Sequence, residues 1–391
     1  MNKTAGFALL FAVPTVLLAL IIVVPAPHYL LWQASVVLTE AALWLVPFAL
    51  VALILGGVAA RQVRVGWLAV VLALVAIGCA LVPTLQALPI ARRLGGRLSL
   101  TRYFVGDRWI QPTINVQRDI VYATVNGRDL RLDYYDPFPA RGLDVAAGER
   151  LPAVIVVHGG SWSGGEKSDF ADYDNWLAQQ RLRVFDVEYR LAVNDERFPA
   201  QIADVKCAIG WVKQNAAQYG VDPERIALLG RSAGGQLALL AAYTPNDPAI
   251  TPSCDAGDTS VQAVVSFYAP ADLVWGYDHP SNLRVIDSKA TLGNYLGGSP
   301  ASVPATYELA APIAQVGPGT PPTLLLHGGN DPLVSHIHAE RLVTQLQAAD
   351  VPHEYLYLPW ATHGFDYLFD GWGSQLAQER ITLFLDTYLN R

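Results

Sequence analysis

The sequence predicts an α/β domain, with a mostly parallel sheet flanked by helices, that follows an all-α transmembrane region of about three helices. Two observations support this. The first 90 residues contain only four charged side chains and three long apolar runs. Beyond residue 112, short runs of β-branched and other apolar residues alternate with segments of helical periodicity, as in parallel sheets buried on both faces. We therefore divide the chain into a membrane anchor (1–90), a linker (91–112) and a larger domain (113–391).

The anchor contains three candidate spans, near residues 6–24, 41–60 and 66–90. Each has about 19 to 25 largely apolar residues, enough to cross a hydrocarbon core roughly 30 Å thick. Residues 29–39 are also apolar, but Glu40 ends the run, and a charge at the bilayer centre costs roughly 2.5 to 3.5 kcal/mol. We expect an interfacial stretch there, with Glu40 at a helix start.

The alternative for residues 1–25 is a cleaved signal peptide. No small-x-small cleavage pattern is evident and two further spans follow at once, so an uncleaved multi-pass anchor is favoured. With three spans, the N-terminus and the large domain face opposite sides. Arg61 and Arg64 mark their short loop as cytoplasmic, although basic residues at 92, 93, 97 and 102 nearly balance them. We expect the large domain to be extracytoplasmic.

Net charge limits the classes of binding partner, and the cysteine positions limit the possible disulfides. The net charge is −7; the anchor contributes +2, so residues 91–391 carry −9, which argues against a nucleic-acid partner. Of the three cysteines, Cys79 lies in a span. A Cys207–Cys254 disulfide stays open, but a buried thiol is favoured for Cys207. No feature indicates an oligomeric state.

The large domain is expected to begin with strands at 114–124 and 129–135, joined by the hairpin signal Asn126-Gly127. Parallel strands and helices then alternate, with helix 200–219 as an example, because its apolar residues share one face. The parallel strands are expected near Val154, Val184, Ile226, Val264, Leu324 and Tyr355. Segment 272–321, long and rich in Gly and Pro, is expected to be a lid insertion or an ordinary surface excursion.

The motif Gly230-Arg-Ser232-Ala-Gly234 follows an apolar strand and precedes a helical run at 236–242. A sharp turn between strand and helix lifts the serine hydroxyl above the sheet, where it can act as a nucleophile. On its own the motif is weak, since a helix start capped by Ser232 has the same pattern.

Three other strands end in polar motifs. Strand 152–157 runs into His158-Gly-Gly-Ser-Trp162, whose backbone amides can face a developing oxyanion. Strand 322–326 leads to Asp331, and strand 354–358 leads to His363. Because the carboxyl ends of parallel strands meet at one edge of a sheet, we expect Ser232, Asp331 and His363 to converge.

Together these motifs, in this order, resemble the α/β-hydrolase superfamily, and within it the hormone-sensitive-lipase-like and feruloyl-esterase-like carboxylesterases. The resemblance covers roughly residues 115–391 and implies a mostly parallel, eight-stranded sheet. Ser161 stands where a third glycine is usual, and Arg231 where an acidic residue is common. The motifs that carry the resemblance are His158–Trp162, Glu188–Ala192, Phe198–Ala200 with Asp204, Asp222–Ile226, Gly230–Gly235, His327–Pro332 and His363–Phe365.

The chemistry and the resemblance assign the same roles. Ser232 is the expected nucleophile, His363 the general base and Asp331 the group that orients the imidazole. The oxyanion hole is expected from N–H groups of Gly159, Gly160, Ser161 and Ala233. Trp162 and Arg231 are candidate pocket residues, and Arg231 is expected to influence which substrate charge the pocket prefers. This serine esterase, or lipase-like, chemistry needs no cofactor or metal; the expected partners are a small-molecule or lipid ester and the bilayer.

Several other polar residues compete for these roles. Asp272 is the rival for the triad acid, although helix capping is preferred for it. His327 is expected to bond nearby backbone, and His336 and His338 to lie on a solvated helix face. Glu166 and Lys167 are expected to be solvated or to line the pocket mouth. The alternative functions are a peptidase of related fold, an arylformamidase, an acyl-sugar deacetylase and an inactive membrane-tethered binding module.

Overall fold

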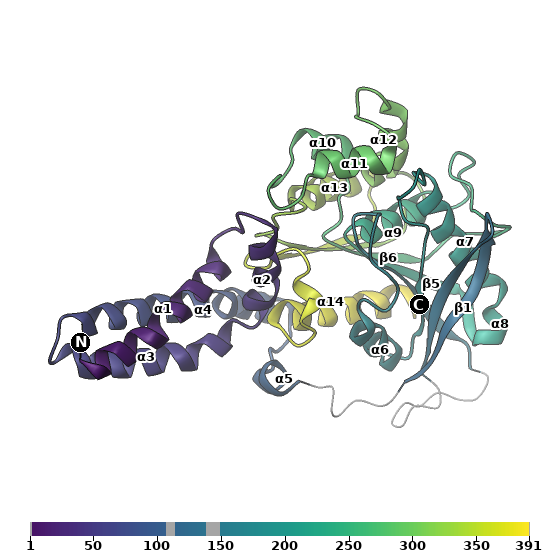
Figure 1. The fold of residues 1–391 in the computed structure, drawn as a ribbon. Coiled ribbons are helices and arrows are strands. Elements are labelled where there is room, and N and C mark those ends of the chain that lie inside the picture. Colours follow the sequence, from purple (N-terminus) through teal and green to yellow (C-terminus); the bar gives the residue numbers. More distant parts are fainter. Residues whose placement is uncertain (1, 107–113, 138–148, 391) are drawn as a thin grey trace.

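The computed structural model describes residues 2–106, 114–137 and 149–390. A bundle of long helices projects from a domain built on a single sheet (Figure 1). The bundle consists of α1 (Lys3–Val23), α3 (Val46–Ala60) and α4 (Val65–Leu94). The three expected apolar helices are therefore present, and each is long and apolar enough to cross a membrane when η1 (Ala42–Leu45) is joined to α3.

The bundle is held together by small side chains. Alanines of all three helices are fully buried between them, which lets the backbones approach closely, as in membrane helix pairs. Large apolar side chains such as Phe7, Leu10 and Ile54 face outward and are more than half exposed. Small side chains between the helices and large apolar side chains on the outer surface are typical of helices packed within a lipid phase.

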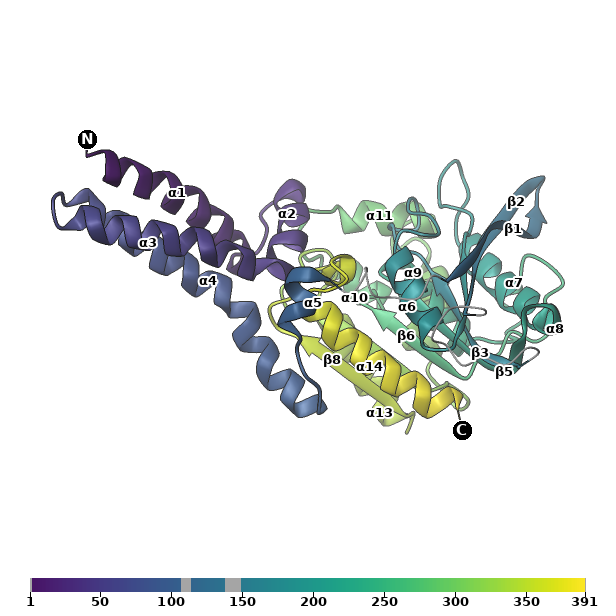
Figure 2. The same ribbon diagram turned by 90° about the horizontal axis from the view of Figure 1, so that it is seen from below.

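Helix α2 (Tyr29–Glu40) lies between the bundle and the sheet domain in both ribbon views (Figures 1 and 2). The expectation that Glu40 starts a helix is wrong, because Glu40 is the last residue of α2. Its carboxylate is buried and accepts hydrogen bonds from the Gly373 backbone N–H (2.8 Å) and from Trp360 Nε1 (3.2 Å). Glu40 therefore joins the anchor to the large domain.

The sheet has eight strands in the order β1-β2-β4-β3-β5-β6-β7-β8. Strand β2 pairs antiparallel with β1 and β4, and all other neighbours are parallel, which confirms the expected mostly parallel, eight-stranded sheet. The strands are β1 (Asn115–Val125), β2 (Arg128–Asp136), β3 (Leu151–Val157), β4 (Arg183–Val187), β5 (Val221–Arg231), β6 (Ala263–Phe267), β7 (Thr323–Gly328) and β8 (His353–Leu358).

Helices cover both faces of the sheet. They are α6 (Ala171–Gln179), α7 (Ala200–Gln214), α8 (Ala216–Tyr219), α9 (Ala233–Tyr243), α13 (Ile337–Ala348) and α14 (Trp372–Leu389). Alternate residues of β3 enter different cores: Ile155 belongs to the core that includes residues of α7, α9 and α13, whereas Val154 belongs to the core that includes residues of α6 and α14. The second core also receives Ala87 and Ala91 from the end of α4, so the last bundle helix is packed onto the domain (Figure 2).

The segment between β6 and β7, expected to be a lid or an excursion, forms a helical layer at one end of the sheet (Figure 1). It comprises α10 (Leu273–Asp278), α11 (Ser288–Leu296), α12 (Pro304–Ala310) and η2 (Pro312–Gln315). The expected linker begins inside α4 and includes α5 (Leu100–Val105), and its residues 107–112 lie outside the described residues.

The expectation of a buried thiol at Cys207 is wrong. Cys207 of α7 forms a disulfide with Cys254, with 5.4 Å between the Cα atoms. The helix residue and the polar loop are 47 positions apart, so their proximity depends on the fold and could not be seen in the cysteine spacing.

Candidate active site

The serine motif forms a strained turn between β5 and α9. Ser232 has φ 53° and ψ −120°, a conformation that side-chain-bearing residues rarely adopt. The turn requires the flanking glycines, because a Cβ at Gly230 would lie 2.2 Å from the Gly234 carbonyl oxygen. The Ser232 N–H donates to the Phe267 carbonyl (2.9 Å), which fixes the turn to the neighbouring strand.

The structure brings Ser232, His363 and Asp331 together. His363 Nε2 lies 3.0 Å from Ser232 Oγ, and His363 Nδ1 lies 2.7 Å from Asp331 Oδ2. Each residue follows a different strand, β5, β8 and β7, at the carboxyl edge of the sheet. The alternative that Ser232 merely caps α9 is disfavoured, since its side chain makes no capping hydrogen bond.

Asp331 is held as a carboxylate. Its other oxygen, Oδ1, accepts from the N–H groups of Leu333 (2.8 Å) and Val334 (2.9 Å). Burial alone would raise the pKa of this carboxyl, but the attraction and hydrogen bonds of His363 and His327 outweigh it and hold the pKa well below its usual range. An ionised Asp331 favours the Nδ1–H tautomer of His363, which leaves Nε2 free to accept the Ser232 proton.

The loop after β3 lies against the serine turn. A Cβ at Gly159 would sit 3.0 Å from the Arg231 carbonyl oxygen and 3.4 Å from Ser232 Cβ. Gly160 and Ser161 both have positive φ, at 113° and 54°. Within the described residues, the N–H groups of Gly160, Ser161 and Ala233 have no protein acceptor. Three of the four expected oxyanion donors, Gly160, Ser161 and Ala233, therefore line the same cavities as Ser232 and have N–H groups available to a ligand.

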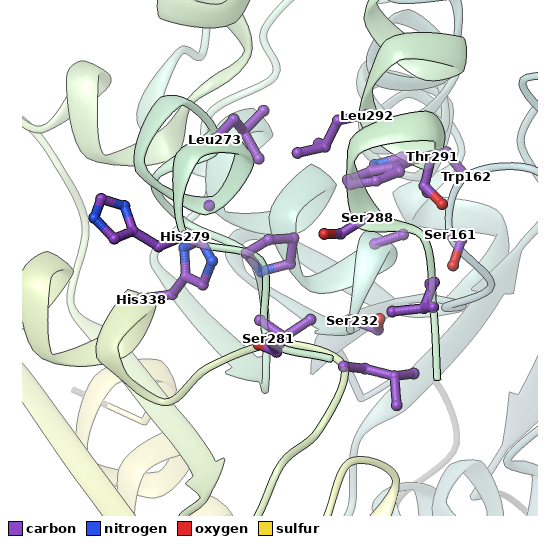
Figure 3. Close-up of a pocket in the computed structure, with 16 residues that line it drawn as sticks. Ser161, Trp162, Ser232, Leu273, His279, Ser281, Ser288, Thr291, Leu292 and His338 are labelled. Atoms are coloured by element: carbon purple, nitrogen blue, oxygen red, sulfur yellow. The ribbon is translucent and has the colours of Figure 1, made fainter. Parts of the chain in front are cut away.

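Trp162 borders a small cavity of about 60 Å³ beside Ser232, under the helical layer of α10 and α11 (Figure 3). Its indole stacks on Tyr295 with ring centroids 4.2 Å apart and donates to Gln236 Oε1 (2.8 Å). Leu273 and Leu292 close the cavity on the side of the layer (Figure 3). Trp162 is thus a fixed wall.

Arg231 borders a second cleft, but its guanidinium is committed elsewhere. Arg231 Nε donates to Asp366 Oδ2 (2.5 Å), and both side chains are almost fully buried. Aromatic rings surround the guanidinium: Arg231 Cζ lies 4.0 Å from the ring centroid of Phe170 and 4.7 Å from that of Tyr173. Tyr268 donates to the other oxygen of Asp366 (2.6 Å). The positive charge is therefore compensated inside the protein.

The rival residues have structural roles. Asp272 caps α10 through Trp275 N–H (3.0 Å), as preferred, and pairs with Arg341 (2.7 Å). His327 Nε2 lies 3.0 Å from the Val334 carbonyl oxygen, as expected. The expectation of a solvated His338 is wrong: it is buried, its Nδ1 accepts from the Asp272 N–H, and burial lowers its pKa to about 3.

His336 is partly exposed beside Glu340. Glu166 is exposed, as expected, whereas the expectation of a solvated Lys167 is wrong because it pairs with Asp119 (2.9 Å) and Asp133 (3.0 Å) and is only 11% exposed.

Helix α2 is also part of this site, which the motifs in the sequence do not indicate. A cleft of about 720 Å³ is lined by Ser232 and His363 on one side and by α2 on the other. Trp32 Nε1 donates to the His363 carbonyl oxygen (3.2 Å), although the two residues are 331 positions apart. The residues that α2 contributes to the lining are Tyr29, Trp32, Gln33, Val36 and Val37. In the sequence, the only indication that residues 29–39 could line a site is that polar and aromatic side chains interrupt this apolar run.

Comparison with known proteins places the chain in a family. The BD-FAE family model matches residues 143–346. Esterase LipQ of Mycobacterium tuberculosis is 32% identical over 276 residues, which cover 70% of this chain and 62% of LipQ. The probable carboxylic ester hydrolase LipM of the same organism is 36% identical over 242 residues, which cover 61% of this chain and 54% of LipM. The chain thus matches a little over half the length of these relatives.

Solved structures agree on the fold. Esterase 2 of Thermogutta terrifontis matches with a TM-score of 0.56 and 25% identity, over 70% of this chain and 92% of that one. A carbohydrate esterase from gut microbiota matches with a TM-score of 0.58 and 22% identity, over 71% and 97%, which shows the fold alone. The chain belongs to the BD-FAE family of α/β-hydrolases and resembles the hormone-sensitive-lipase-like carboxylesterases.

Proposed function

We propose that this protein is a membrane-anchored serine carboxylesterase that cleaves carboxylic esters through an acyl-enzyme. The observation that carries the proposal is the hydrogen-bonded chain from Ser232 Oγ through the His363 imidazole to Asp331, next to three unengaged backbone amides. The esterase and carboxylic ester hydrolase names of the relatives support the same chemistry.

In the proposed mechanism, Ser232 Oγ attacks the acyl carbon while His363 Nε2 accepts its proton. His363 returns that proton to the leaving alcohol, and a water molecule then repeats the sequence to release the acid. Amides of the loop after β3 and of Ala233 stabilise the oxyanion, and each such donor typically lowers the barrier by about 3 kcal/mol. Asp331 remains ionised and stabilises the imidazolium.

We further propose that the three apolar helices span a membrane and that the hydrolase domain is extracytoplasmic. The Cys207–Cys254 disulfide supports this orientation, because disulfides persist mainly outside the cytoplasm. Arg61 and Arg64, in the loop between α3 and α4, favour the cytoplasmic side for the opposite end of the bundle. In right-side-out vesicles, added protease should then digest the hydrolase domain; protection there with digestion in inverted vesicles would reverse the assignment.

The activity is tested with a fluorophosphonate probe and short 4-nitrophenyl esters on the detergent-solubilised full chain. The unaltered protein and Ser299→Ala, which changes a partly exposed serine that lines neither cavity, should be labelled and active. Ser232→Ala should lose the label and nearly all hydrolysis. Absence of labelling in the folded, unaltered protein would support a binding module, and faster cleavage of aminoacyl amides than of esters would support a peptidase.

A further inference from the structure

Helix α2 forms a wall of the active-site cleft although it belongs to the anchor. The cleft reaches from Ser232 and His363 to the side chains of Trp32, Val36 and Val37. Val36 also packs against the histidine loop, 3.9 Å from where a Cβ of Gly364 would be. The far part of any ligand held at Ser232 and filling this cleft must therefore contact the anchor.

The position of α2 relative to the membrane follows from its neighbours in the chain. Helix α1 ends at Val23 and the next apolar helix begins at Ala42, so α2 is held where two apolar helices leave the bundle (Figures 1 and 2). Exposed apolar side chains lie on α2 and just after it in the chain, including Leu30 of α2, which is 70% exposed, and Trp44, which is 49% exposed and contacts Phe104. Exposed aromatic and apolar side chains at a helix end are typical of the membrane interface.

Tryptophan hydrogen bonds fix this arrangement. Trp32 donates to the His363 carbonyl, Trp360 donates to Glu40, and Trp372 donates to Thr84 Oγ1 (2.8 Å). The outer rim is tied as well, since Asn282 Nδ2 donates to the Ala26 carbonyl (2.9 Å) and so joins the α10–α11 connection to the α1–α2 connection. The cleft is therefore a built site and not a gap between two loosely joined parts.

The lining of the cleft suits an apolar ligand. Val36, Val37, Ile286 and Leu333 contribute aliphatic surface. Among its described lining residues, Arg231 is the only arginine or lysine and Asp169 the only acidic residue. The Arg231 guanidinium is paired with Asp366, and the Asp169 carboxylate accepts from the Glu166 N–H (3.1 Å). The volume of about 720 Å³ lies in the range of small-molecule sites, whereas the cavity that Trp162 borders next to Ser232 has only about 60 Å³.

We propose that the α2 cleft binds the long apolar chain of an ester drawn from the bilayer, while the small cavity holds the short group on the other side of the ester bond. This inference rests on the proposed esterase function and names its substrate class: lipid-soluble esters with one long and one short substituent. Access from the bilayer follows from α2, because the helix that borders the cleft also lies at the membrane interface.

The test uses the full chain in nanodiscs of phosphatidylcholine and phosphatidylglycerol. Methyl laurate and dodecyl acetate place the long chain on the acyl and on the alcohol side, and 4-nitrophenyl acetate reports hydrolysis without a long chain. For at least one long-chain ester, kcat/KM should exceed that for methyl butyrate by tenfold or more. Val37→Trp, which narrows the cleft, should lower the ratio of long-chain to acetate kcat/KM at least tenfold.

Leu30→Trp is the matched control, because it adds the same side chain to the same helix at a position that lines neither cavity. It should leave the ratio within twofold, and thermal unfolding should show that both variants are folded. An unchanged ratio in folded Val37→Trp would overturn the inference while leaving the esterase function intact. If the unaltered, folded protein hydrolyses none of the esters, both the inference and the esterase function are overturned.

The source of the substrate is tested separately. The preferred long-chain ester, premixed into the nanodisc lipid, should be cleaved faster than the same amount offered on albumin in solution. Faster cleavage of the albumin-bound ester would show that the substrate reaches the cleft from water, and would overturn access from the bilayer.

Discussion

The buried pair of Arg231 and Asp366 makes a quantitative prediction that separates two roles for Arg231. Asp366→Asn leaves a buried guanidinium facing a neutral amide, because the Arg231 side chain is only 2% exposed and the Asp366 side chain is fully buried. Breaking a buried pair from one side costs about 3 to 5 kcal/mol. At a few degrees per kcal/mol for a domain of this size, the Tm should fall by about 10 °C.

The double variant Arg231→Met/Asp366→Asn should recover much of that loss. It removes the unpaired charge, and the asparagine carbonyl can still accept from Tyr268. Methionine suits the space between Phe170 and Tyr173, since a flexible thioether packs well against aromatic rings. Arg341→Met is the control, because that arginine pairs with Asp272 while 44% exposed, and such pairs contribute about 0 to 1 kcal/mol.

Thermal unfolding of the detergent-solubilised chain measures these differences, and a double-mutant cycle isolates the pair energy. A free energy of unfolding for Asp366→Asn within 1 kcal/mol of that of the unaltered protein would contradict the reasoning. So would a double variant that is no more stable than Asp366→Asn. Activity supplies the second criterion. The double variant Arg231→Met/Asp366→Asn, which leaves no unpaired charge, should leave the preference between a neutral ester and an anionic hemisuccinate ester within threefold; a tenfold change would support the sequence-based expectation that Arg231 sets the charge preference.

Three further predictions concern the anchor and the disulfide. Burial raises the pKa of Glu40 from 4.5 to about 7, so the folded state binds this proton more tightly and stability should fall by about 3 kcal/mol as pH rises through that window. Glu40→Gln should flatten this part of the Tm profile against pH, and an unchanged slope would show that Glu40 does not titrate there. Trp32→Phe removes a neutral hydrogen bond to the histidine loop, worth about 1 kcal/mol, and should lower kcat up to about fivefold. Trp44→Phe, at a ring that contacts Phe104, should leave kcat unchanged, and equal effects of the two substitutions would exclude a specific role for Trp32. Reduction of the Cys207–Cys254 disulfide, which links residues 47 positions apart, should destabilise the domain by about 4 kcal/mol, and a Tm insensitive to dithiothreitol would contradict this.

The parts of the fold that sequence could predict are those encoded locally. The strand ending at Val157 is apolar without alternation, and the next residues form a turn, so both its burial and its end are visible in the chain. The same holds for the strands before Ser232, Asp331 and His363. Their convergence then follows from one rule, that parallel strands end at a common edge.

The failures share a different cause, which is a partner distant in sequence. Lys167 was expected to be solvated, but Asp119 and Asp133 of the first two strands lie within 3.0 Å of it. His338 was placed on a solvated face, yet its helix turns it toward Asp272 and the Trp275 ring. Hydropathy and helical period assign an average environment to each residue type. They do not indicate which charged group or aromatic ring, distant in sequence, will contact a given side chain in the fold.

Glu40 shows how this limit affects a segment next to candidate membrane spans. The insertion cost of a carboxylate treats the residue as isolated in lipid. In the structure the Gly373 N–H and the Trp360 indole supply two donors, and the close approach depends on Gly371, where a Cβ would lie 2.5 Å from the Glu40 carboxylate. Trp360 lies just before His363 in the chain, and Gly371 and Gly373 lie shortly after it. The carboxylate that argues against a fourth span in the sequence therefore attaches α2 to the segments on either side of His363, and this contact helps to hold α2 as a wall of the cleft.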